Sequence, residues 1–287
     1  MSESQKMILI TGGAGFVGSN LCERLVAEGY RVISLDNYFT GSTDNHIDGV
    51  EYREGHTKDI ARLVPETPDL LYHLGEYSRT EQSHFEPEIV FELNTVGTFS
   101  VLEFVREKKC KLIYAGSSTK FADGGLGRDQ SPYAFTKATN TELVRNYGTW
   151  YGINYAITYF YNVYGNREIA SGPYATVIAR FIDRYKKGEP LTVTAPGTQK
   201  RIFTHVDDIV DGLIVVGEKG MGDEFGLGAA ESYSILDIAE MFNVPIEMTP
   251  EKAGNRMNAV LDTAKSNAIG WHAQKKVEDY IRAVISA

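Results

Sequence analysis

The chain has 287 residues, of which 43% are hydrophobic and 23% are charged. These values are typical of a globular protein with a sizeable core, and they exclude a disordered or fibrous chain. The formal net charge of -9 disfavours a nucleic-acid binder, because such proteins carry an excess of Lys and Arg. The only two cysteines, Cys22 and Cys110, have neither zinc nor disulfide spacing, so we expect no metal site.

The amino terminus, MSESQKMILITGG, lacks a charged segment followed by a long apolar run. No window of the chain approaches the ~20 apolar residues that span a bilayer. We therefore expect a cytoplasmic protein that does not associate with membranes, and we interpret the apolar stretch Met7–Ile10 as a strand.

Short apolar runs alternate with helical patterns through the first half of the chain. The strands are expected at 7–11, 31–36, 50–53, 70–74, 111–115 and 154–159. The helices are expected at 15–28, from about 57, at about 86–107 and at 132–151. This alternation predicts an α/β fold, with a parallel sheet covered by helices on both faces and right-handed crossovers.

The second half of the chain is less regular. We expect helices at 173–187, 207–218 and 235–242, the last capped by Ser234, and a short strand at 191–194. The sequence contains no internal repeat, low-complexity tract or flexible linker. Two interleaved parts therefore fit this half better than two domains joined by a single hinge.

A glycine-rich turn lies between the first strand and the first helix. Gly12, Gly15 and Gly18 in TGGAGFVG have the spacing G-x-x-G-x-x-G. Glycine permits backbone angles closed to other residues, and its missing side chain lets a pyrophosphate approach the N–H groups and the positive end of the helix dipole. The order strand, glycines, helix predicts dinucleotide binding; the alternative is a tight turn without a ligand.

Asp36 ends the second strand, 18 residues after Gly18. A carboxylate at this position accepts hydrogen bonds from both hydroxyls of an adenosine ribose and repels a 2′-phosphate. The residue therefore predicts NAD, rather than NADP, as the cofactor. The alternative is an aspartate that merely begins a loop.

A candidate proton-transfer pair, Tyr133 and Lys137, lies one helical turn apart in the expected helix 132–151. A nearby ammonium favours the phenolate, so such a tyrosine can exchange a proton with a sugar hydroxyl. Ser117 follows the strand 111–115, at the carboxyl edge where ligands bind in open α/β sheets. Alone, each feature also fits a solvated helix face or a polar turn; their combination in this order is much more specific.

With these motifs the chain resembles the extended short-chain dehydrogenases/reductases, specifically their nucleotide-sugar group of the UDP-glucose and UDP-N-acetylglucosamine 4-epimerase type. The resemblance covers nearly the whole chain. It rests on TGGAGFVG, Asp36-Asn37, Asn94–Thr98, Ser117-Ser118, Tyr133 with Lys137, Tyr161–Gly165, Arg201–Asp208, Leu261-Asp262 and Gly270-Trp271.

The resemblance implies a Rossmann-type, doubly wound parallel sheet with a smaller, interleaved C-terminal substrate-binding domain. The NAD-binding domain would comprise 1–163 and about 200–228, and the substrate domain about 164–199 and 229–287. It also implies a homodimer that pairs the helices at about 86–107 and 133–151.

The resemblance also implies roles for single residues. Ser117, Tyr133 and Lys137 would be catalytic, with Lys137 also binding the cofactor ribose. The expected NAD-binding residues are Gly12, Gly15, Phe16, Val17, Gly18, Asp36, Asn37, Thr57, Leu74, Gly75, Asn94, Tyr133 and Lys137. The expected substrate-binding residues are Arg79, Ser118, Asn162, Arg201 and Lys252.

Several positions depart from the pattern of this group. Its usual residues are replaced by His56 after the third strand, Glu76 in His73-Leu-Gly-Glu76, Tyr159, Ile202 and Lys252, and the segment between Ser117 and Tyr133 is short. Arg79 stands where a small residue is usual, so we hypothesise that it binds an acidic or modified group on the sugar. The alternative is a surface arginine paired with Glu76 or Glu81.

The sequence thus predicts an NAD-dependent 4-epimerase of a UDP-hexose or UDP-N-acetylhexosamine, or of a related uronic or modified sugar. The residues Ser117-Ser-Thr119 replace the T-D-E triplet of 4,6-dehydratases, which argues against that activity. A 4-ketoreductase is an alternative, although Asp36 opposes NADPH. A UDP-glucuronate decarboxylase would need a threonine and glutamate arrangement that we do not find. A non-catalytic NAD- or nucleotide-binding protein would not need the proton-transfer residues.

Overall fold

The computed structural model describes residues 5–117, 127–160, 162–250 and 261–286. A seven-stranded sheet with the order β11-β6-β5-β4-β1-β2-β3 forms its centre, and every pair of neighbouring strands in it is parallel. Its strands are β1 (Met7–Thr11), β2 (Arg31–Asp36), β3 (Val50–Glu54), β4 (Leu70–His73), β5 (Lys111–Gly116), β6 (Tyr155–Tyr159) and β11 (Gly222–Gly226).

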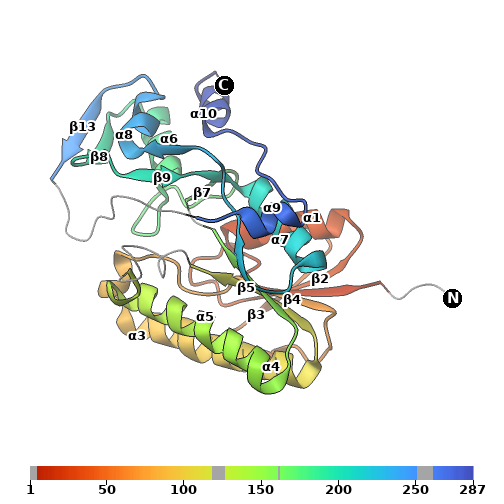
Figure 1. The fold of residues 1–287 in the computed structure, drawn as a ribbon. Coiled ribbons are helices and arrows are strands. Elements are labelled where there is room, and N and C mark those ends of the chain that lie inside the picture. The colour runs from red at the N-terminus through yellow and green to blue at the C-terminus, as the bar shows by residue number, and fades with distance from the viewer. Residues whose placement is uncertain (1–4, 118–126, 161, 251–260, 287) are drawn as a thin grey trace.

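Helices cover both faces of the sheet (Figure 1). One face packs against α1 (Phe16–Ala27) and α7 (Val206–Lys219). The other face packs against α2 (Ile60–Leu63), α4 (Gly97–Lys108) and α5 (Pro132–Tyr151). In β1, Leu9 packs on the face covered by α2, α4 and α5, whereas Ile8 and Ile10 pack on the face covered by α1 and α7. The strand is therefore apolar throughout, as expected of a strand buried on both sides. The predicted doubly wound α/β fold is confirmed.

A second hydrophobic core lies beyond the carboxyl edge of the sheet (Figure 1). It is built by α6 (Val177–Lys186), β8 (Leu191–Thr194), α8 (Ile235–Glu240), β13 (Ile246–Thr249) and α10 (Val277–Ser286). The chain leaves the central sheet after β6, forms α6 and β8, and returns to the sheet with α7 and β11. The two cores are therefore built from alternating stretches of sequence.

The connections contain further short elements. Two small sheets pair β7 (Val163–Tyr164) with β10 (Thr204–His205) and β9 (Lys200–Ile202) with β12 (Ser232–Ser234). The remaining helices are η1 (Thr43–Asn45), η2 (Thr57–Asp59), η3 (Gln82–His84), α3 (Pro87–Val90), the π-helical η4 (Phe91–Val96) and α9 (Ala264–Ala268). No helix in the described ranges has the length and apolar character needed to cross a bilayer.

The helix α5 shows how local sequence fixes an element, and its predicted bounds are confirmed. The Ser131 hydroxyl accepts a hydrogen bond from the Ala134 N–H at 3.0 Å, and Pro132 occupies the first turn. Gly152 ends the helix in the left-handed conformation, with φ 68°. By contrast, the single helix predicted at about 86–107 is divided into α3, η4 and α4.

Candidate active site

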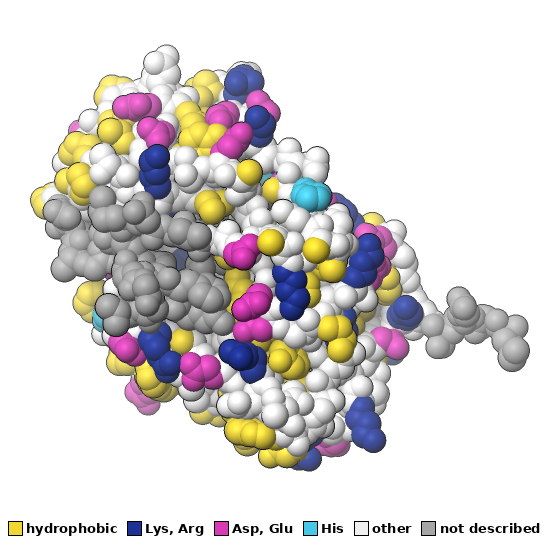
Figure 2. Space-filling model, in the orientation of Figure 1, with side chains coloured by type: hydrophobic (Ala, Val, Ile, Leu, Met, Phe, Trp, Pro, Cys, Tyr) yellow, Lys and Arg dark blue, Asp and Glu magenta, His cyan; other side chains and the backbone are white. Residues whose placement is uncertain are grey.

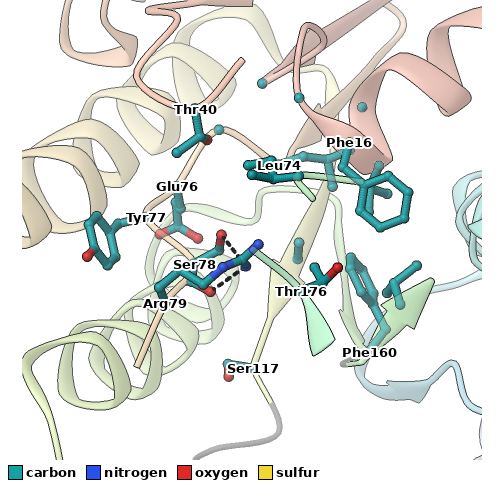
Figure 3. Close-up of a pocket in the computed structure, with 18 of the residues that line it drawn as sticks. Phe16, Thr40, Leu74, Glu76, Tyr77, Ser78, Arg79, Ser117, Phe160 and Thr176 are labelled. Atoms are coloured by element: carbon teal, nitrogen blue, oxygen red, sulfur yellow. Dashed lines mark hydrogen bonds between the residues drawn. The ribbon is translucent and has the colours of Figure 1, made fainter. Parts of the chain in front are cut away.

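A cavity of about 460 Å³ opens at the carboxyl edge of the sheet, between the sheet and the second core (Figure 3). The edge lies where β1 has β2 on one side and β4 on the other, the switch point at which α/β sheets bind ligands. Fifteen of the residues predicted from the sequence line it: Gly12, Gly15, Phe16, Val17, Gly18, Asp36, Asn37, Leu74, Gly75, Arg79, Ser117, Tyr133, Lys137, Asn162 and Arg201.

Each of the three positions in the turn is a glycine for a different physical reason. Gly12 has φ 77°, and a Cβ there would lie 2.8 Å from the Gly75 Cα. A Cβ on Gly18 would lie 2.0 Å from the Gly12 carbonyl oxygen, so this glycine permits the turn to close on the helix. A Cβ on Gly15 has only that oxygen within 4 Å, at 3.2 Å. Gly15 therefore leaves space on the cavity side, where a diphosphate needs it.

The helix α1 offers free backbone donors to this space. No side chain caps its first turn, in which Phe16, Val17 and Gly18 line the cavity. The first N–H groups of a helix have no partner within the helix, and the dipole adds a partial positive charge. The turn thus fits a diphosphate.

Asp36 lies at the end of β2, as predicted. Its carboxylate accepts the Ala14 N–H at 2.9 Å and the Tyr38 N–H at 2.8 Å. Burial raises the pKa of this carboxyl, although the backbone N–H groups act in the opposite direction. Each oxygen keeps a second lone pair on the cavity side, so both can accept ribose hydroxyls.

The three predicted catalytic residues converge on one wall of the cavity. The Tyr133 hydroxyl donates to the Ser117 oxygen at 3.2 Å. One turn later on α5, the Lys137 ammonium donates to the Ala115 carbonyl oxygen and to the Glu76 carboxylate. The arrangement places a phenol, a hydroxyl and an ammonium where a sugar hydroxyl can meet them, which is the layout of a proton-transfer site.

Glu76 also belongs to this site, although from the sequence it was only a departure from a family pattern. Its side chain is 3% exposed, beside a Lys137 side chain that is 6% exposed. Because Glu76 pairs with Lys137, the alternative in which it pairs with Arg79 is wrong. A buried charge needs a partner, so the signal in the sequence was an acidic residue three positions after a buried strand.

The second core contributes the wall opposite Tyr133. Asn162, with φ 50°, donates to the Ile202 carbonyl oxygen at 3.2 Å, and Arg201 donates to that of Lys200 at 2.8 Å. Glu168 also lines the cavity and accepts from the Gly165 N–H at 2.9 Å and from the Thr176 hydroxyl. Burial raises the pKa of Glu168 to about 7.

Arg79 is held by its neighbours so that it faces the cavity. Its Nε donates to the Tyr174 carbonyl oxygen at 2.8 Å, and its Nη1 donates to the carbonyl oxygen and hydroxyl of Ser78. Figure 3 shows the side chain folded against Ser78. The structure gives its Nη2 no hydrogen bond to a described residue, so one edge of the guanidinium is available to a ligand.

Of the predicted binding residues that the structure describes, Thr57 and Asn94 do not line the cavity. Thr57 is buried beside Gly97, and the Asn94 side chain accepts the Tyr77 N–H at 2.7 Å and donates to the Thr136 hydroxyl. Ser118 and Lys252 lie outside the described residues. Within the described ranges, no group of three or more His, Cys, Asp and Glu residues could hold a metal ion.

The fold and this site define a Rossmann-type α/β protein with a dinucleotide cradle beside a tyrosine–lysine pair. Comparison with known proteins places it further: the model of the NAD dependent epimerase/dehydratase family matches residues 8–228, and the chain belongs to that family.

Individual relatives are similar over most of their length. The "Putative UDP-glucose 4-epimerase" of Methanocaldococcus jannaschii is 27% identical, with 98% of this chain and 97% of the relative covered. UDP-glucuronic acid decarboxylase 5 of Arabidopsis thaliana is 29% identical, with 96% and 87% covered. The solved structure of Thermus thermophilus UDP-glucose 4-epimerase in complex with NAD is 26% identical, with 98% of both chains covered and a TM-score of 0.87.

Proposed function

We propose that the protein is an NAD-dependent nucleotide-sugar 4-epimerase that acts on a UDP-linked hexose, N-acetylhexosamine or related uronic sugar. The observation that carries the proposal is the contact of the Tyr133 hydroxyl with Ser117, one helical turn from Lys137, in the same cavity as the glycine turn and Asp36. A proton-transfer group is thereby combined with a dinucleotide cradle.

The residues divide the work as follows. The glycine turn would hold the diphosphate and Asp36 the adenosine ribose, and bound NAD supplies the hydride acceptor and donor. Tyr133, as its phenolate, takes the proton of the sugar 4-hydroxyl while Ser117 shares the hydrogen bond, and the 4-keto sugar then turns over in the cavity. Tyr133 returns the proton when the 4-hydroxyl forms again on the other face.

The test is incubation of the purified protein with a panel of UDP-, GDP-, CDP- and dTDP-sugars, with and without added NAD, and NMR analysis of the products. Interconversion at C4 without net formation of NADH is the expected result. Net formation of NADH, the reverse of ketoreduction, would replace the epimerase with a ketoreductase, and loss of CO₂ from a uronic sugar would replace it with a decarboxylase. Bound NAD without turnover would leave only a binding protein.

Arg79 favours a substrate with an acidic group among the sugars of this class. The guanidinium lines the cavity, and its Nη2, which no described residue engages, is a donor suited to a carboxylate. We infer that it contacts the carboxylate of a uronic sugar, the kind of substrate for which several relatives are named.

The Arg79→Ala variant tests this inference against a matched pair of substrates. The kcat/KM for a UDP-uronic sugar is expected to fall at least about tenfold more than that for the corresponding neutral sugar, since a hydrogen bond to a charged group contributes about 1.5–3 kcal/mol. Arg79→Lys, which keeps the charge without the planar fork, should lie between the two. Equal losses for both sugars would remove the idea.

We further propose that two copies of the chain associate through α3, η4, α4 and α5. Eight of the ten large hydrophobic side chains that are exposed in the described ranges lie in or directly before these helices: Phe85, Ile89, Phe91, Val96, Phe99, Phe135, Trp150 and Tyr151. Phe99→Glu is expected to yield a monomer in sedimentation equilibrium, whereas Met221→Glu, at an exposed methionine elsewhere, should stay dimeric. A monomeric wild-type protein would refute the dimer.

A further inference from the structure

Glu76 is enclosed by donors that come from three elements around the catalytic lysine. Its carboxylate accepts from Lys137 and from the Asn140 amide at 2.8 Å, both on α5. It also accepts from the Thr98 hydroxyl on α4 at 2.7 Å and from the Tyr114 hydroxyl on β5 at 3.1 Å. Such a set of donors is specific for the ionised carboxylate, because a protonated acid would have to donate in turn.

The charge of Glu76 follows from its surroundings. Burial by itself would raise the pKa of this carboxyl, but Lys137, His73 and the hydrogen bonds outweigh burial and lower it. His73 does not supply a permanent positive charge, because burial lowers its pKa to about 4. At neutral pH, Glu76 and Lys137 therefore form an ion pair with no net charge.

The contacts also decide how many protons of the Lys137 ammonium remain for a ligand. An ammonium has three donors. One is directed to Glu76 and one to the Ala115 carbonyl oxygen, and the Tyr114 ring lies 4.7 Å from Nζ. No other described residue accepts from the ammonium, so one donor is left, and the two contacts hold the lysine in place before any ligand binds.

We propose that Glu76 is a positioning residue that fixes the Lys137 ammonium and cancels its charge, so that the Tyr133 phenol stays protonated to a higher pH than a lone ammonium would allow. The proposal rests on the proposed role of Tyr133 in proton transfer. Among the described residues, the charged and titratable groups around the phenol and this ion pair are Lys137, Glu76, His73, Tyr114, Tyr77, Tyr174, Arg79 and Glu168.

The test is a spectrophotometric titration of Tyr133 in the purified protein, followed by the near-ultraviolet absorbance of phenolate. The titration of Tyr133→Phe is subtracted from that of the wild type, and the same subtraction is made in the Glu76→Gln background. The Tyr133 midpoint is expected to fall by about one to two pH units in Glu76→Gln. This is the size of effect expected when one nearby charge is removed at an effective dielectric constant of about 20. Coinciding midpoints, or a rise, would overturn the proposal.

Two further variants keep the outcome independent of folding problems. Glu76→Asp retains the charge and should keep the wild-type midpoint within a few tenths of a unit. Combining Lys137→Met with Glu76→Gln removes both charges, and its midpoint should return towards the wild-type value. If Glu76→Gln does not fold, Glu76→Ala takes its place, and an unchanged midpoint in that variant refutes the proposal.

The titration uses no substrate, so it separates this inference from the proposed function. A protein that epimerises no nucleotide sugar but shows the shift would retain the ion-pair role and lose the activity. Where turnover is found, the acidic limb of the pH profile of kcat/KM should move in the same direction as the Tyr133 midpoint, whereas a merely structural role of Glu76 would lower kcat/KM equally at every pH.

Discussion

The proposed function divides the cavity into a cofactor side and a sugar side, and the two are built differently. On the cofactor side, the glycine turn and Asp36 lie within the first 36 residues, and both carboxylate oxygens of Asp36 already accept backbone N–H groups. On the sugar side, Arg79, Glu168 and Arg201 come from segments far apart in the chain, and Nη2 of Arg79 has no hydrogen bond to a described residue.

This difference reflects two binding requirements: one is common to all dinucleotides, and the other is particular to the sugar. Every dinucleotide presents the same diphosphate and ribose, so a contiguous strand–turn–helix unit is sufficient to bind them. A sugar is recognised by a few side chains placed around it, and these depend on how the second core docks on the sheet. Acidic and basic side chains are interspersed over the face drawn in Figure 2.

The largest expected effect lies where the two sides meet, at Tyr133. Tyr133→Phe removes the hydroxyl that contacts Ser117 and should lower kcat by about 10²- to 10⁴-fold, the usual range for loss of a general acid–base group. The affinity for NAD, measured by calorimetry, should change less than tenfold. Retention of a tenth or more of the wild-type kcat would show that another group moves the proton.

Two glycine variants test whether one glycine of the turn leaves room for the ligand while another is needed for the chain to fold. Gly15→Ala meets only the Gly12 oxygen, at 3.2 Å, so its melting temperature should stay close to that of the wild type while its affinity for NAD falls about tenfold or more. Gly18→Ala would bring a Cβ to 2.0 Å from the same oxygen, and overpacking of this kind typically costs about 1–3 kcal/mol of stability. Equal melting temperatures for the two variants would contradict the distinction.

A smaller effect is expected on the sugar side, at Glu168. Because burial raises the pKa of Glu168 in the folded protein to about 7, above the ordinary value of 4.5, the folded state binds the proton more tightly. The associated stability is fully present below about pH 4.5 and is lost as the pH rises through about 7, by up to about 2–3 kcal/mol.

Urea unfolding between these pH values measures this dependence. Glu168→Gln should show a flatter profile than the wild type, whereas Glu28→Gln, at an exposed position, should reproduce the wild-type profile. Identical slopes for Glu168→Gln and the wild type would place the titration elsewhere.

The sequence predicted those parts of the molecule whose signals are local. The alternation of apolar runs and helical patterns defined six of the seven central strands, and the bounds of α5 follow from Ser131, Pro132 and Gly152. The strand β11, with the sequence GDEFG, was missed because it has neither an apolar run nor a polar alternation. It becomes a strand by pairing with β6 at the edge of the sheet, which is a tertiary event.

The amino-acid sequence by itself determined the α/β layering, the glycine cradle, Asp36 and the tyrosine–lysine spacing, because each depends on residues close together in the chain. Only the tertiary structure decided that Glu76 pairs with Lys137, that Arg79 faces the cavity, and that Thr57 and Asn94 lie away from it. The physical reason is that the partner of a buried charge is chosen by packing between elements, and no spacing along the chain specifies that choice.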